Sequence, residues 1–123
     1  MSVLNNIWDA LVRGAKRIWK MCVKIVKEIV DFFADIFNWL RDYFNNLVDD
    51  NEREAIVVNW KELIDDAIRK GDVVDVGLKK NTIAAGVFNT RTNEIERFKV
   101  IEADSLDYKT KEVLGGRKIV IVE

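Results

Sequence analysis

Apolar residues recur along residues 4–48 at the spacing of one helix face, and this pattern constrains the fold more than any other feature. In a heptad frame starting at Trp8, one position carries Trp8, Ala15, Cys22, Ile29, Ile36 and Tyr43. The position three residues further on carries Leu11, Ile18, Ile25, Phe32, Trp39 and Asn46. All of these except Asn46 are apolar, which is typical of one long amphipathic helix.

A single helix over residues 4–48 would present more apolar surface than the rest of the chain can cover. At 1.5 Å per residue it would be roughly 65 Å long, whereas a domain made from the remaining residues has an expected radius of gyration of about 11 Å. The pattern therefore predicts that residues 1–50 form a helical oligomerisation segment in a bundle. The predicted oligomer interface consists of Trp8, Leu11, Ile18, Trp19, Ile25, Ile29, Phe32, Phe33, Ile36, Trp39, Leu40 and Tyr43.

Residues 51–123 carry the signals of a small α+β domain. Asn59 and Glu62 have the spacing of a capping box, and Gly71 marks the end of the short helix that they begin. Runs rich in β-branched residues predict strands at 73–78, 82–88, 95–101, 108–114 and 118–122. With hairpin turns at 89–93 and 114–117, they predict an antiparallel meander of four or five strands with the short helix on one face.

The run 119–122 is apolar on both alternating faces. This predicts a strand covered from both sides, either by the chain itself or by a neighbouring subunit. The expected fold class is therefore α+β, with a long N-terminal helix that forms bundles and a small domain after it.

Composition narrows the classes of function. The chain is 49% hydrophobic and 33% charged, which is too apolar for a disordered protein and too charged for an integral membrane protein. Histidine is absent, which removes the commonest general base and the commonest zinc ligand. The first apolar stretch soon meets Arg13 and does not resemble a signal peptide. We expect a cytoplasmic, non-enzymatic protein without a cofactor, in which Cys22 is a small buried side chain.

Acidic residues lie close together at three places in the sequence. They are Asp65 with Asp66, Glu94 with Glu96, and Asp49 and Asp50 with Glu52. The first two pairs are of a type that serves acid/base catalysis, and the third offers oxygen ligands to a divalent cation. Solvated surface charge explains all three more simply, and the third group does not match the spacing of a calcium loop.

Basic and acidic residues are unevenly distributed, although the formal net charge is −1. Residues 1–27 contain six basic residues and one acid, and residues 28–52 contain seven acids and one basic residue. Antiparallel or staggered packing of two such helices would bring opposite charges together, which favours self-association. The basic, tryptophan-containing first half also suits an anionic membrane surface, and peripheral membrane binding is the alternative function.

Basic residues in the predicted strands suggest a third function. Arg91, Arg97 and Lys99 are candidates for holding a small anionic ligand between subunits. Interleaved acids cancel most of this patch, so the sequence gives no strong nucleic-acid signal. The leading hypothesis is a self-associating structural or binding protein whose partner is another copy of itself.

Overall fold

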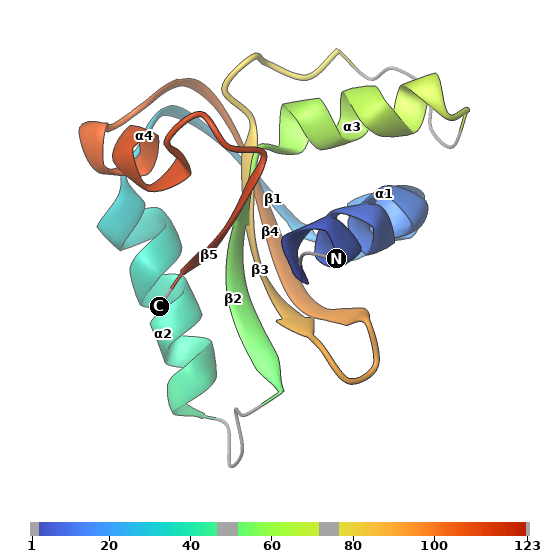
Figure 1. The fold of residues 1–123 in the computed structure, drawn as a ribbon. Coiled ribbons are helices and arrows are strands. Elements are labelled where there is room, and N and C mark those ends of the chain that lie inside the picture. Colours follow the sequence, from blue (N-terminus) through green and yellow to red (C-terminus); the bar gives the residue numbers. More distant parts are fainter. Residues whose placement is uncertain (1–2, 47–51, 72–76, 123) are drawn as a thin grey trace.

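The computed structural model describes residues 3–46, 52–71 and 77–122, which form a mixed β-sheet with helices on both faces (Figure 1). The elements in chain order are α1 (Val3–Met21), β1 (Val23–Val30), the π-helical turn η1 (Phe32–Phe37), α2 (Asn38–Asn45), β2 (Arg53–Val58), α3 (Trp60–Arg69), β3 (Ile83–Asn89), β4 (Glu94–Leu106), α4 (Tyr108–Leu114) and β5 (Ile119–Val122). The chain is therefore α+β, as the sequence predicts.

The five strands lie in the order β1-β4-β3-β2-β5. β1 runs parallel to β4, from Val23 opposite Lys99 to Val30 opposite Leu106. The other neighbouring strands are antiparallel. The predicted all-antiparallel meander is therefore wrong, because one strand comes from the N-terminal segment and pairs in parallel.

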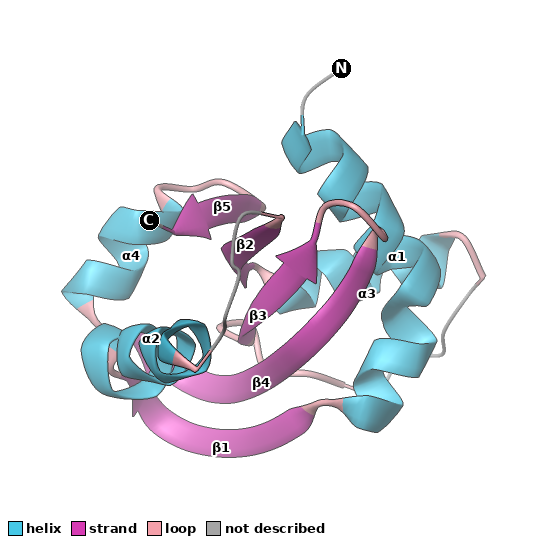
Figure 2. Cartoon of the chain, turned by 90° about the horizontal axis from the view of Figure 1, so that it is seen from below, coloured by secondary structure: helices cyan, strands magenta, loops and turns pink. Residues whose placement is uncertain are grey.

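The two faces of the sheet are covered by different helices (Figure 2). The core beneath α1 and α3 includes Leu11, Val12, Trp60, Leu63 and Phe98. The core beneath η1, α2 and α4 includes Ile36, Leu40, Val57, Ile101 and Leu114. Burial of these side chains on both faces supplies the main driving force for folding.

The predicted continuous helix over residues 4–48 is wrong. α1 ends at Met21, and the chain then forms β1, η1 and α2. β-Branched side chains occupy most of β1 and favour extended backbone: Val23, Ile25, Val26, Ile29 and Val30. A helical spacing of apolar residues in this stretch is thus compatible with a strand, and pairing with β4 selects the strand.

Asp31 and Asp35 begin a new element instead of continuing the polar face of a helix. Asp31 is extended, with φ −102°, and its carboxylate accepts a hydrogen bond from the backbone N–H of Ala34. The Asp35 carboxylate in turn accepts a hydrogen bond of 2.8 Å from the backbone N–H of Asp31. This reciprocal capping satisfies donors at the start of η1 and fixes the turn between β1 and η1.

The predicted short helix is confirmed as α3. The Asn59 side chain accepts a hydrogen bond of 3.2 Å from the backbone N–H of Glu62. Gly71 adopts a φ of 77° just after the helix, a left-handed conformation that glycine adopts readily. The predicted strands at 82–88 and 95–101 are confirmed as β3 and β4, which form the predicted hairpin.

Residues 108–114 form α4, so the strand predicted there is wrong. The Asp107 carboxylate accepts a hydrogen bond of 2.9 Å from the backbone N–H of Thr110 and starts the helix. Gly115, at φ 54°, ends it in the left-handed conformation. The expected hairpin turn at 114–117 is therefore a helix C-cap that leads into β5.

The strand predicted at 73–78 lies mostly outside the described residues. Residues 72–76 are not described, and Gly77 and Leu78 are not in a strand.

The proposed boundary at residue 50 does not divide the sheet. β1 belongs to the same sheet as β2–β5, and α1 packs against α3. The Trp19 and Trp60 rings are stacked at 6.4 Å between centroids, and Trp8 Nε1 donates a hydrogen bond of 3.1 Å to the Asp66 carboxylate. Residues from both predicted domains therefore share one core.

Candidate functional site

The residues of the predicted oligomer interface are mostly used inside the subunit. Those that are buried are Leu11, Ile18, Phe32, Ile36 and Leu40. Those that are half-buried are Trp8, Trp19, Ile25, Trp39 and Tyr43. Ile29 and Phe33 remain, with 55% and 52% of their surface exposed. The stripe is covered largely by the chain's own sheet.

β1 forms one of the two edges of the sheet. β1 is the outermost strand and pairs with β4 on one side (Figure 2). No described element extends the sheet beyond β1. A strand in this position presents backbone N–H and C=O groups along its outer side, where another strand can add.

Exposed apolar side chains concentrate at this edge. The described part of the chain has six large hydrophobic residues that are exposed, and five of them lie in or next to β1: Met21, Val23, Val26, Ile29 and Phe33. Val26 is the most exposed apolar residue of the strand, at 69%. Isolated exposed apolar residues are common, but a contiguous group marks an interaction surface. We call Met21, the β1 strand and Phe33 the β1 edge.

The charged residues of β1 are held in different ways. The Lys27 ammonium lies 2.8 Å from the Asp35 carboxylate, and the Lys24 ammonium lies 4.5 Å above the Trp19 ring. Glu28 is exposed and makes no ion pair with another described residue. Lys24 therefore lies on the α1 face of the sheet, whereas Lys27 lies on the η1 face.

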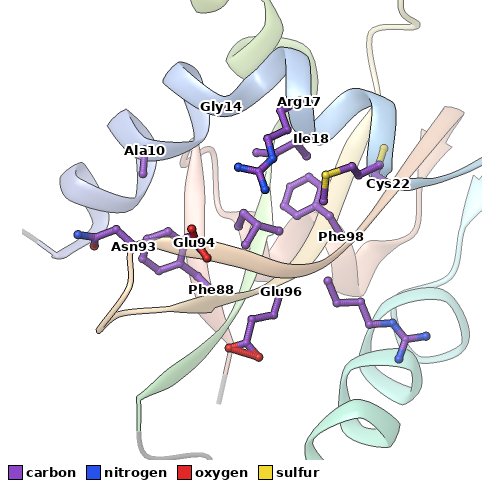
Figure 3. Close-up of a pocket in the computed structure, with 13 residues that line it drawn as sticks. Ala10, Gly14, Arg17, Ile18, Cys22, Phe88, Asn93, Glu94, Glu96 and Phe98 are labelled. Atoms are coloured by element: carbon purple, nitrogen blue, oxygen red, sulfur yellow. The ribbon is translucent and has the colours of Figure 1, made fainter.

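A hollow of about 170 Å³ adjoins the start of β1, between α1 and the first part of β4 (Figure 3). Arg17 reaches toward it from α1 and Glu94 from β4, while Glu96 points to the opposite side of β4 (Figure 3). Ile18, Met21, Cys22 and Phe98 complete much of its wall. Small-molecule pockets usually measure about 300–1,000 Å³, so this hollow is sized for a side chain.

A second groove, of about 330 Å³, lies between α2 and the β2 and β5 strands. Its lining includes Phe44 and Arg53, which bracket a connection that includes residues 47–51. Those residues lie outside the described ranges.

Cys22 is half-buried at the entrance to β1. Its thiol donates a hydrogen bond of 3.6 Å to the Trp19 carbonyl oxygen. Burial raises the pKa of the thiol, and the nearby Lys24 charge only partly opposes that effect. A raised pKa keeps the thiol protonated and unreactive, in keeping with a packing role.

The predicted anion-binding residues are only partly brought together. The Arg97 guanidinium lies 4.6 Å and the Lys99 ammonium 5.6 Å from the Trp39 ring centroid. Lys99 also donates a hydrogen bond of 2.8 Å to the Asp35 carbonyl oxygen, and burial lowers the pKa of its ammonium. Arg91 is in the β3–β4 turn and pairs with Glu52 at 2.7 Å. The side chains of Arg91, Arg97 and Lys99 are therefore already engaged by an aromatic ring or by acceptor oxygens of the same subunit.

Four of the acidic residues singled out from the sequence have structural partners: Glu52, Asp65, Asp66 and Glu96. Glu96 accepts hydrogen bonds from Tyr43, Arg53 and Asn89 and so ties β4 to α2, β2 and β3. Burial opposes ionisation of Glu96, but these hydrogen bonds outweigh it and lower its pKa. Asp65 pairs with Lys61, and Asp66 with Arg69. Asp49 and Asp50 lie outside the described residues.

No group of three or more cysteine, aspartate or glutamate side chains is arranged to hold a metal ion in the described ranges. None of the helices described has both the length and the apolar character needed to cross a bilayer.

Sequence reasoning missed the β1 edge because it assigned residues 23–30 to a helix. The high content of valine and isoleucine in this stretch was the available signal. Comparison with known proteins adds no family assignment: no family model, curated protein or solved structure matches the chain. The function is therefore argued from the geometry of the surface.

Proposed function

We propose that this chain is a non-enzymatic assembly protein that associates with another copy of itself through the β1 edge. The observation that carries the proposal is the exposure of Val23, Val26 and Ile29 along the outermost strand of the sheet. Pairing with a second strand would satisfy outward-facing backbone groups and remove these side chains from water in one step.

The usual protection of a sheet edge is weak in β1. Natural proteins often block edge pairing with lysine side chains that project beyond the strand. Here Lys27 is drawn onto Asp35 and Lys24 is positioned above Trp19. Neither ammonium needs to be displaced for a partner strand to approach, which supports association at this edge.

Peripheral binding to an anionic membrane is the second candidate, and the outer face of α1 favours it. Arg13, Lys16, Arg17 and Lys20 are all exposed. The apolar face of α1 is buried against α3 and the sheet, with Leu11 and Val12 fully covered. Attraction to lipid would therefore be electrostatic, at about 1 kcal/mol for each basic residue near the surface.

The two candidates are separated by a mass measurement and a flotation assay. Light scattering after size exclusion should give twice the 14.3 kDa chain mass at micromolar concentration. Val26→Lys should return the mass to that of one chain, since it places a charge at the most exposed apolar residue of the β1 strand. Thr92→Lys is the matched control because Thr92 is exposed in the turn between β3 and β4, outside the part of β4 that pairs with β1, and this variant should remain dimeric.

A wild-type protein that stays monomeric at tens of micromolar would overturn the assembly proposal. In that case, flotation with vesicles of phosphatidylserine at low and high salt tests the second candidate. Binding that salt abolishes would support a membrane role through the α1 cations.

A further inference from the structure

We infer that two copies pair their β1 strands antiparallel, about a twofold axis that passes beside Val26. This inference rests on the proposed self-association and specifies its geometry. It follows from the side-chain alternation and the charge order of one strand, Val-Lys-Ile-Val-Lys-Glu-Ile-Val over Val23–Val30.

The alternation of side chains restricts which residues can lie opposite one another. Lys24 contacts Trp19 on the α1 face, and Lys27 contacts Asp35 on the η1 face. Residues that lie directly opposite in an antiparallel pair project from the same face of the sheet. In a symmetric pair, even-numbered residues of β1 must therefore face even-numbered residues, and odd-numbered residues must face odd-numbered ones.

Among the registers that obey this rule, one matches both charge and apolar character. With Val26 opposite Val26 of the partner subunit, Lys24 lies opposite Glu28 of the partner subunit, and the symmetry repeats this pair. Val23 then faces Ile29 of the partner subunit. The exposed valine and isoleucine side chains of one copy are thereby covered by those of the other.

Neighbouring registers lose this match. Moving the axis to Lys27 sets two lysines against each other and places Glu28 opposite Val26 of the partner subunit. Moving it to Ile25 leaves Lys24 opposite Val26 of the partner subunit, without a counter-ion. Like charges that lie opposite destabilise a strand pair. A parallel pair about a twofold axis would turn one sheet over and set side chains of opposite faces beside each other, so it cannot form a regular strand pair.

The favoured register also agrees with the contacts that β1 makes within its own subunit. It places Lys27 opposite Ile25 of the partner subunit, so the ion pair of Lys27 with Asp35 remains intact. Met21, which is 64% exposed, would lie beside Asp31 of the partner subunit, next to the exposed Phe33. The apolar contact would thus continue past both ends of the strand.

Disulfide trapping tests the register directly, in a Cys22→Ala background that removes the native thiol. Opposite Cα atoms in an antiparallel pair are about 4.5–5.5 Å apart, which a disulfide spans. Val26→Cys alone should give a covalent dimer on mild oxidation. Val23→Cys alone and Ile29→Cys alone should not, whereas a mixture of these two variants should cross-link.

A charge exchange provides an independent test. Lys24→Glu and Glu28→Lys should each raise the dimer dissociation constant about tenfold or more, because each turns two attractive pairs into two repulsive ones. Mixing the two variants should restore association, since every opposite pair in the mixed dimer then has opposite charges. High salt should reduce the difference.

The outcomes separate the register from self-association itself. A wild-type monomer at tens of micromolar removes both proposals. A wild-type dimer whose Val26→Cys variant fails to cross-link, or whose Val23→Cys variant cross-links equally well alone, removes the register and leaves self-association in place.

Discussion

The two edge strands of the sheet have similar residues but different surroundings. β5, Ile119–Val122, consists of valine and isoleucine only, and Ile119 and Val120 are 6% and 9% exposed. β1 has the same β-branched character, yet Val26 is 69% exposed. The two strands are alike in apolar character and differ in how far the rest of the chain covers their side chains.

The positions of the helices explain why the side chains of β5 are more buried than those of β1. α1 packs mainly against α3, β4 and β5, so it leaves the outer part of β1 open. Ile119 lies in the core beneath α1 and α3, and Val120 lies in the core beneath η1, α2 and α4. Ile119 and Val120 are therefore buried as predicted, on opposite faces and by the same chain, whereas Ile121 and Val122 are half-buried.

The largest expected effect is the difference in free energy of unfolding between two variants, one with a lysine in β5 and one with a lysine in β1. Ile119→Lys places an unpaired charge in the core and should lower the free energy of unfolding by about 3 kcal/mol or more. Val26→Lys should change the free energy of unfolding of the monomer by less than about 0.5 kcal/mol, since the site is solvated. Urea denaturation followed by circular dichroism, at a concentration where the protein is monomeric, measures both. Equal destabilisation would contradict the assigned difference between the edges.

The next effect concerns Asp107, which supports the elements beside both edges. Its carboxylate accepts hydrogen bonds from the backbone N–H of Phe32, in the turn after β1, and from Thr110, in the helix before β5. Asp107→Ala should lower the free energy of unfolding by about 2 kcal/mol, as expected for loss of capping at two helix starts. Urea denaturation at neutral pH gives the value, and Tyr108→Ala is a neighbouring control with little expected effect.

The same carboxylate gives a pH dependence with a definite sign. Burial opposes its ionisation, but hydrogen bonds from Thr110 and the Phe32 backbone outweigh burial and lower the pKa of Asp107 below its ordinary value. The stabilisation is thus present above the pKa of the unfolded chain and is lost as pH falls through the lowered folded value. Denaturation between pH 7 and pH 2 should show a smaller loss in Asp107→Asn than in wild type. Identical pH profiles would contradict this role.

A smaller effect is expected at Lys27, which belongs to the open edge. Lys27→Met removes the ion pair with Asp35 while keeping the aliphatic stem, and it should lower the free energy of unfolding by about 1 kcal/mol. Lys24→Met is the matched control at a concentration where the protein is monomeric, because Lys24 has no ion pair with a described residue of its own subunit. Thermal denaturation of the two variants in parallel distinguishes them, and a larger loss in the control would refute the assignment.

The smallest expected effect is on the rate at which the Cys22 thiol, at the start of β1, reacts with a labelling reagent. Because burial raises the pKa of this thiol, iodoacetamide should label it more slowly than free cysteine at pH 8. Association should slow labelling further as protein concentration rises, since the proposed register places Val30 of the partner subunit opposite Cys22. In Val26→Lys, labelling should not depend on protein concentration.

The sequence predicted well where local signals and packing agree. The Asn59 cap, the helix that follows it and the β3–β4 hairpin are specified by neighbouring residues. It failed where a local pattern is compatible with two structures. Apolar spacing in residues 23–30 fits a helix or a strand, and the choice depends on pairing with β4, which lies far along the chain.

The same distinction explains what could be predicted of the candidate site. Ile29 and Phe33 belong to the predicted interface and are exposed, but their neighbours in that prediction are covered by the sheet. Val23 and Val26 were not in it. Val23 lies outside the main stripe of the helical frame, whereas Val26 has the same heptad position as Trp19 and Phe33 and was omitted from the predicted interface. Exposure along a sheet edge is a property of topology, so residue spacing alone does not reveal it.

The parallel pairing of β1 with β4 has a consequence for how the protein forms. Val23 lies opposite Lys99, so closing this pair requires a long loop that includes β2, α3 and β3. Contacts between such distant residues form slowly, because the entropy lost on loop closure precedes the gain from pairing. While a ribosome makes the chain, the valine-rich strand therefore emerges well before its partner, and must remain unpaired until β4 has been synthesised.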